Sequence, residues 1–249
     1  MQNGGVISCR GMTGAIRGLG DQGLIFDSAI NGKIKPARGY ETRKQAQEIL
    51  NYYEILLSLG ENKFHYFVDK LGSFEELKSR FSSLIIGGET ADELHRRLCR
   101  VSKHAGTGGH SEYYIWTIYG TAEFKKYVDN PYKITTIRLK VRDLGFVKND
   151  YPRYDQVCQK AREQFGLSLC PAGVGLYLRL KDLDQPANHR YEIVMNPVRD
   201  MYGSCVLYLG NRPDDGGLSI GGSSRDNNNR PELDCELVFL VSQKPVRER

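Results

Sequence analysis

Basic and aromatic side chains gather in residues 90–114, a segment with helical periodicity in its first part. Four basic residues recur there at a spacing that puts them on one side of a helix, opposite an apolar stripe, and two tyrosines follow. Cationic groups contact phosphates and aromatic rings stack on bases, so the pattern predicts a surface for an anionic partner, DNA or RNA above all. The predicted binding residues are Arg96, Arg97, Arg100, Lys103, Tyr113 and Tyr114. An ordinary amphipathic helix also turns a charged face to water, and this is the alternative interpretation.

Acidic side chains alternate in PELDCELVF, residues 231–239. If this segment is a strand, its carboxylates share one face, and because like charges repel, something cationic should lie opposite them. Arg179 and Lys181 are candidates, a divalent metal is another, and water on an edge strand is a third. A metal would make the cluster the site of a metal-dependent hydrolase or nuclease. The predicted ligands under that hypothesis are Glu232, Asp234, Glu236, Asp182 and Asp184.

Other kinds of site have less support in the sequence. The glycine-rich stretch GMTGAIRGLG, residues 11–20, has neither the dinucleotide-binding spacing nor that of a P-loop, and the Gly-Lys pair at 32–33 is followed by isoleucine. No G-x-S-x-G nucleophile motif occurs. Zinc needs about four ligands in tetrahedral reach, so we interpret one local group as a packed thiol with surface histidines. That group consists of His95, Cys99, His104 and His110.

Composition places the chain among ordinary globular proteins. Of its 249 residues, 40% are hydrophobic and 26% are charged, which is enough apolar material for a core. The net charge of +5 is spread along the chain, so no basic tail is indicated. The six cysteines are far apart and the chain start has no signal-peptide pattern, which predicts reduced thiols in a cytoplasmic protein. The apolar runs are short, so no membrane partner is expected.

The elements expected from periodicity and caps favour an α+β fold, in which an N-terminal helical region precedes a mixed domain with a C-terminal antiparallel sheet. We divide the chain into a glycine-rich arm (1–40, with a short strand at 23–27), a helical region (41–112), an α+β domain (113–244) and a tail (245–249). The expected helices cover 41–60, 73–85, 90–106, 121–129 and 153–166. The expected strands cover 113–120, 134–141, 176–180, 190–195, 204–210 and 235–241.

Residues 113–241 carry ordered motifs that resemble those of a group of uncharacterised bacterial proteins. The matching motifs are Trp116, Ile118 and Gly120, DLGF (143–146), YDQVCQKA (154–161), LCPAGVGLYLRL (169–180), Asp184-Gln185-Pro186, EIVMNPV (192–198) and LVFLV (237–241). The sequence departs from the group's pattern at Ala172-Gly173, where a carboxylate is more usual, and at Leu176, where proline is common. The resemblance implies one domain and carries no catalytic residue over.

These observations lead to a functional hypothesis with two alternatives. The first is a soluble binding or regulatory module for an anionic partner, nucleic acid being the foremost candidate. The second is a divalent-metal-dependent hydrolase or nuclease. The third is a protein–protein component of a toxin–antitoxin or phage-defence system.

Overall fold

The computed structural model describes residues 26–27, 35–36, 55–56, 58–102, 110–200, 203–215, 217–224 and 230–245. The chain divides into two compact units between Ser79 and Arg80. The elements of the first unit are β1 (Phe26–Asp27), β2 (Lys35–Pro36), α3 (Glu61–Leu71) and α4 (Phe74–Ser79). β1 pairs with β2 antiparallel and lies inside the short strand expected at 23–27. The rest of the predicted arm and most of the helix predicted at 41–60 lie outside the described residues.

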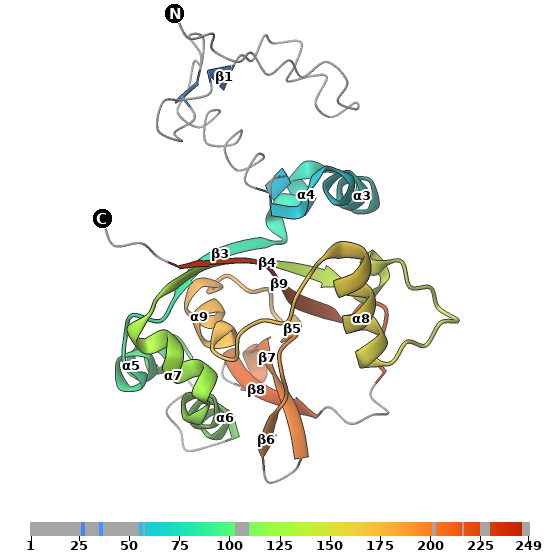
Figure 1. Ribbon diagram of the computed structural model, residues 1–249. Coiled ribbons are helices and arrows are strands. Elements are labelled where there is room, and N and C mark those ends of the chain that lie inside the picture. Colours follow the sequence, from blue (N-terminus) through green and yellow to red (C-terminus); the bar gives the residue numbers. More distant parts are fainter. Residues whose placement is uncertain are drawn as a thin grey trace, which may run out of the picture. The chain divides into compact units, whose positions relative to one another are not determined.

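The second unit is built on a seven-stranded sheet, which confirms the α+β prediction (Figure 1). Its strands are β3 (Phe81–Ile86), β4 (Tyr132–Lys140), β5 (Arg190–Ile193), β6 (Val198–Asp200), β7 (Gly203–Arg212), β8 (Gly217–Ser224) and β9 (Glu236–Pro245). β3, β4, β9, β5 and β7 follow one another across the sheet, and β6 and β8 both pair with β7. The β5–β9 pair is parallel and the other pairs are antiparallel.

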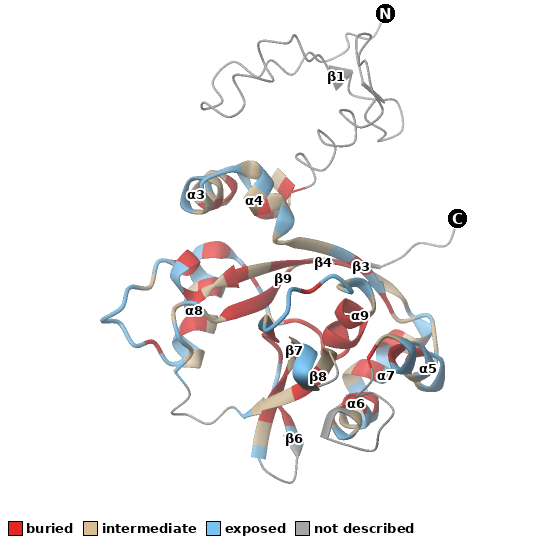
Figure 2. Cartoon of the chain, turned by 180° about the vertical axis from the view of Figure 1, so that it is seen from behind, coloured by how far each residue is buried: buried red, intermediate tan, exposed pale blue. Residues whose placement is uncertain are grey.

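Helices pack against the sheet and contribute to its hydrophobic core. They are α5 (Ala91–Val101), α6 (His110–Gly120), α7 (Ala122–Asp129), α8 (Tyr154–Phe165) and α9 (Val174–Lys181), with short 3-10 turns η2 (Val141–Leu144) and η3 (Pro213–Asp215). α9, shown buried along most of its length in Figure 2, packs in one apolar cluster with α5, α6, α7 and the inner strands. Val238 and Leu240 of β9 belong to that cluster, whereas Leu237 and Phe239 alternate with them and are buried on the reverse face.

Locally capped or alternating segments follow their predictions. The helices α7 and α8 and the strands β4, β5, β7 and β9 are confirmed within a few residues at each end. α5 begins as predicted and ends at Val101, and residues 103–106 of that prediction lie outside the described part of the chain. α4 begins at the predicted cap, where the Ser73 hydroxyl accepts the Glu76 N–H at 3.1 Å. The remainder of the helix predicted at 73–85 is wrong, since residues 81–86 form β3. Because β3 and α5 belong to the second unit, the sheet draws on residues that the sequence analysis assigned to the helical region.

The strand predicted at 113–120 is wrong, because these residues form α6. Ile115, Ile118 and Tyr119 recur three and four residues apart and are buried together, which is the pattern of one helix face. The Thr117 hydroxyl donates to the carbonyl of Tyr113 at 2.9 Å, one helical turn earlier. Aromatic and β-branched residues favour strands, but here packing against the core overrides that preference.

The strand predicted at 176–180 is also wrong, because these residues lie in α9. Residues 174–179 are all buried, so their alternation of leucine with polar residues does not mark an exposed face. Gly175 permits the close approach: a Cβ at this position would lie 3.0 Å from Leu207 and 3.1 Å from Ile193. A short apolar run surrounded by protein fits either a helix or a strand, and alternation alone did not distinguish them.

A buried arginine fixes the loop that follows α9. Arg179 has no exposed surface, and its Nη1 donates to the Gln185 side-chain oxygen at 2.6 Å and to the Gly210 carbonyl at 3.3 Å. Its Nη2 donates to the Asp182 carbonyl. The Gln185 amide nitrogen donates to the carbonyls of His189 (2.9 Å) and Leu209 (3.1 Å). The DLDQP segment is therefore a loop tied to β7 rather than the end of a strand.

The turn between β3 and α5 depends on two adjacent glycines. Gly87 and Gly88 have positive φ angles of 84° and 75°. The Gly88 N–H donates to the carbonyls of Tyr127 (3.2 Å) and Val128 (3.1 Å), which ties the turn to α7. A Cβ at Gly87 would lie 1.9 Å from the Tyr127 carbonyl oxygen, whereas one at Gly88 would make an ordinary contact with Pro131.

This difference predicts unequal effects of two neighbouring substitutions. Gly88→Ala should cost about 1–2 kcal/mol of unfolding free energy from the left-handed backbone alone. Gly87→Ala adds a backbone clash and should cost at least about 3 kcal/mol. Urea unfolding of both variants measures the difference, and equal losses would show that the Tyr127 contact does not constrain the turn.

Candidate nucleic-acid interface

α5 presents basic side chains outward because its start and its inner face are both fixed. The Thr90 hydroxyl accepts the Glu93 N–H at 3.3 Å, and the Glu93 carboxylate accepts the Thr90 N–H at 2.8 Å. This backbone hydrogen bond from Thr90 is the main reason why the pKa of Glu93 is lowered. Leu94 and Leu98 are fully buried on the inner face. The predicted start of this helix and its apolar stripe are thus confirmed.

The predicted basic residues of α5 differ in how their charge is compensated. Arg97 pairs with Glu89 at 2.6 Å. Arg96 and Arg100 are exposed, and no ion pair joins either to a carboxylate within the described part of the chain. The Arg96 Nε donates only to the Asp92 carbonyl at 3.3 Å. Two of the predicted arginines therefore have no ion pair with a described carboxylate, although the charge of Arg96 helps to lower the pKa of Glu93, and the predicted Lys103 lies outside the described residues.

Exposed aromatic rings lie on the neighbouring helix α6. Trp116 is 45% exposed and Tyr113 is 38% exposed. The Trp116 ring lies 5.0 Å from the His95 ring of α5 and 5.3 Å from the largely buried Tyr119 ring. The Glu112 carboxylate accepts the indole N–H of Trp116 at 3.5 Å. These contacts brace Trp116 while leaving nearly half of it open to solvent.

Because residues 110–120 form a helix, the aromatic residues at the open surface differ from those predicted for binding. Tyr114 packs against β8, where a Cβ on Gly222 would lie 2.3 Å from its ring, so it is not part of the open surface. Trp116 takes that place, three residues after Tyr113 and hence on a similar side of the helix. Sequence reasoning missed Trp116 as a binding residue because it expected a strand. We call Arg96, Arg100, Tyr113 and Trp116 the α5–α6 surface.

The predicted carboxylate cluster is not arranged as a strand face. Glu232 and Asp234 precede β9, which begins at Glu236, so the expected alternation of the three acids is wrong. Asp234 is exposed and pairs with Arg142 and, at 3.9 Å, with Lys140.

Glu236 is the buried member of the predicted set, with a side chain only 10% exposed. Arg80 lies 3.3 Å from its carboxylate, Arg138 lies 3.2 Å away and His189 lies 3.1 Å away. Two arginines and His189 therefore occupy the surroundings in which a metal ligand would need an open carboxylate.

Asp182 meets Glu236 through a shared arginine. Its carboxylate accepts the Tyr191 hydroxyl at 2.6 Å and lies 3.6 Å from Arg138. Burial and this carboxylate raise the pKa of Tyr191. Asp184 is exposed in the loop after α9. No group of three or more metal-ligating side chains comes together in the described residues, so the five predicted acids do not form one site there.

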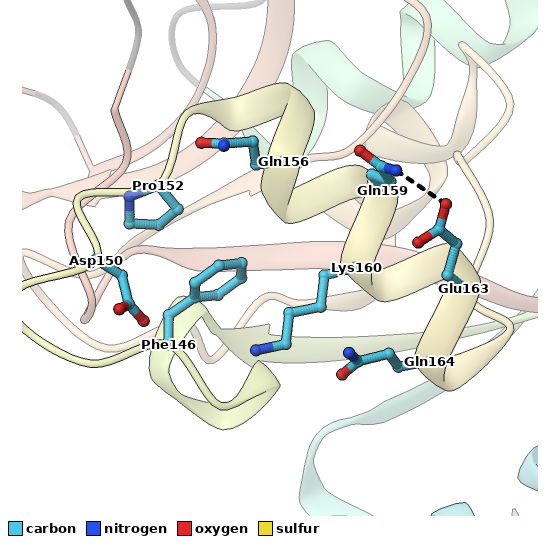
Figure 3. Close-up of a pocket in the computed structure, with 8 residues that line it drawn as sticks. All are labelled: Phe146, Asp150, Pro152, Gln156, Gln159, Lys160, Glu163 and Gln164. Atoms are coloured by element: carbon cyan, nitrogen blue, oxygen red, sulfur yellow. Dashed lines mark hydrogen bonds between the residues drawn. The ribbon is translucent and has the colours of Figure 1, made fainter.

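A shallow hollow of about 430 Å³ lies between α8 and the loop before it (Figure 3). Its lining consists of Phe146, Asp150, Pro152, Gln156, Gln159, Lys160, Glu163 and Gln164. The Lys160 ammonium sits 4.2 Å from the centre of the Phe146 ring and donates to the Gly145 carbonyl at 3.2 Å. Gln159 donates to Glu163 at 2.9 Å. Gln159, Lys160 and Glu163 are thus already engaged within the protein, and the hollow indicates no particular ligand.

The chain matches no family model, no curated protein and no solved structure. The resemblance to the bacterial group therefore stays a prediction, and the function is argued from the geometry above. None of the helices in the described ranges combines the length and apolar character that a bilayer crossing requires.

The contact between α5 and α6 leads us to expect that a substitution in α6 changes the reactivity of the Cys99 thiol in α5. Cys99 lies 3.5 Å from His95, and burial together with the Glu112 carboxylate raises the pKa of its thiol. Glu112→Gln removes the negative charge, so the pKa should fall and alkylation at pH 7.5 should accelerate a few-fold, because the thiolate is the nucleophile. Site-resolved mass spectrometry after iodoacetamide pulses measures the rate at Cys99. The matched variant Glu163→Gln should leave that rate unchanged, and equal rates in all three proteins would contradict the placement of α6.

Proposed function

We propose that the protein binds single-stranded nucleic acid through the α5–α6 surface. In this proposal Trp116 and Tyr113 stack on unpaired bases, while Arg96 and Arg100 contact the phosphates. The observation that carries the proposal is the exposed Trp116 ring, which packs on His95 of α5, the helix that also bears the exposed Arg96 and Arg100.

A single strand suits this surface better than a duplex. Base faces are available to aromatic side chains only where the bases are unpaired, since a duplex keeps them stacked on one another. Base-pair edges in a duplex groove are read mainly by hydrogen-bonding side chains, whereas the exposed rings of Trp116 and Tyr113 offer flat faces for stacking. In the described part of α5 two arginines are free of ion pairs, so the electrostatic contribution is modest and stacking has to supply much of the affinity.

The alternative functions gain less support. A metal-dependent hydrolase would need carboxylates open to a metal, but Glu236 and Asp182 are engaged with protein cations and Tyr191. No described feature bears specifically on a toxin–antitoxin or phage-defence component.

Intrinsic fluorescence tests the proposal, because Trp116 is the only tryptophan in the chain. Titration with a 15-nucleotide oligo(dT) or oligo(U) should quench its emission, and a duplex of the same length should quench it less. Binding should weaken as salt rises, since bound phosphates release counterions. Absence of quenching at low salt would reject the stacking contact.

Substitutions separate the two kinds of contact, with anisotropy of a labelled oligonucleotide as the readout. Trp116→Ala should lose about 1–3 kcal/mol of binding free energy, the usual value for one stacked base. Arg96→Glu with Arg100→Glu should weaken binding and flatten its salt dependence. The control reverses the same number of charges elsewhere, at the exposed Lys148 and Arg162. An equal loss in the control would mean that only net charge matters.

A further inference from the structure

β3 lies at one edge of the sheet and pairs on one side only, with β4 (Figure 1). The Arg138 N–H donates to the Arg80 carbonyl at 2.8 Å, which sets the phase of the ladder. Backbone groups that face a neighbour strand alternate along an antiparallel pair. Ser82, Leu84 and Ile86 therefore direct their N–H and C=O groups to β4, and residues 81, 83 and 85 direct theirs outward.

Most of the outward backbone groups of β3 have no hydrogen-bond partner among the described residues. The Lys181 ammonium, at the last turn of α9, donates to the Ser83 carbonyl at 2.9 Å. Phe81, Ser83 and Ile85 have no other hydrogen bond toward this edge in the described part of the chain. Ile85 is 57% exposed, although Leu84 and Ile86 on either side of it are buried. An apolar strand with open backbone groups is a template for a further strand.

We propose that this edge pairs with β3 of a second copy of the chain, antiparallel and centred on Ser83. The register is self-complementary: the outward groups of Ser83 meet those of the same residue in the second copy, and Phe81 lies opposite Ile85 twice. Such apolar cross-strand pairs stabilise a sheet, and the small serine at the centre leaves the strands free to approach. The two copies are related by a twofold axis, and the sheet continues from one to the other.

Lys181 sets the strength of this association. Its ammonium already donates to the Ser83 carbonyl, which the second strand needs as a hydrogen-bond acceptor. Pairing also brings the Lys181 charges of the two copies close to the twofold axis. Lysine at an edge strand commonly limits such pairing. The dimer of the unaltered chain is therefore weak, and removing the Lys181 amine strengthens it.

Sedimentation velocity of the full chain without nucleic acid, from micromolar to several hundred micromolar, tests the interface. Lys181→Ala should lower the dimer dissociation constant at least tenfold. In the Lys181→Ala background, Ile85→Lys should abolish dimers, because it places a charge in the apolar pair of Phe81 and Ile85. Val147→Lys changes another exposed apolar residue (61% exposed) and should leave the constant unchanged.

A second blocking variant acts through the backbone. Ser83→Pro removes an outward N–H and leaves the β4 ladder intact, a position where edge strands accept proline, so it should also give monomers. Retention of dimers in both Ile85→Lys and Ser83→Pro would place the interface elsewhere and overturn the proposal. Monomers at every concentration in the unaltered chain and in Lys181→Ala would overturn it as well.

Discussion

The buried guanidinium of Arg179 is the interaction on which the second unit depends most. Burial lowers the pKa of Arg179, which expresses the cost of keeping a charge away from water. Oxygen acceptors from Gln185, Gly210 and the Asp182 backbone offset that cost. Since Gln185 in turn donates to two backbone carbonyls, one charge couples the end of α9 to β7 and gives the loop a single conformation.

That loop decides what the acidic residues do. It sets Asp182 against Tyr191 and His189 against Glu236, with Arg138 bridging the two carboxylates. On this part of the sheet each charge is compensated, which is typical of a structural network. The outer face of α5 differs, because Arg96 and Arg100 are exposed and no ion pair joins them to a carboxylate in the described residues, while His95 of the same helix packs on the open Trp116 ring. The contrast between ion-paired cations and the exposed Arg96 and Arg100 is what separates the architectural charges from the candidate binding surface.

Sequence reasoning succeeded where local chemistry determines the structure. Thr90 and Thr121 mark helix starts because their hydroxyls accept backbone N–H groups within the next turn, and such caps are visible in the sequence. It failed for α6 and α9, whose short apolar runs take their form from surrounding protein. The first of these errors affected the candidate site, because a strand at 113–120 would place Trp116 and Tyr113 on opposite faces, whereas the helix places them on a similar side. The long-range partners of Glu236 are Arg80 just before β3, Arg138 of β4 and His189 of the loop after α9, and no local pattern encodes them.

A double-mutant cycle on Arg179 and Gln185, followed by urea unfolding, tests the central role of the buried guanidinium most directly. Arg179→Met leaves backbone and amide oxygens unpaired, and Gln185→Met leaves part of a buried charge unpaired, so each should cost about 3 kcal/mol or more. The double variant should cost less than the sum of the two, with a coupling energy of at least about 1 kcal/mol. Additive effects within about 0.5 kcal/mol, or an Arg179→Met variant as stable as the unaltered protein, would contradict the account.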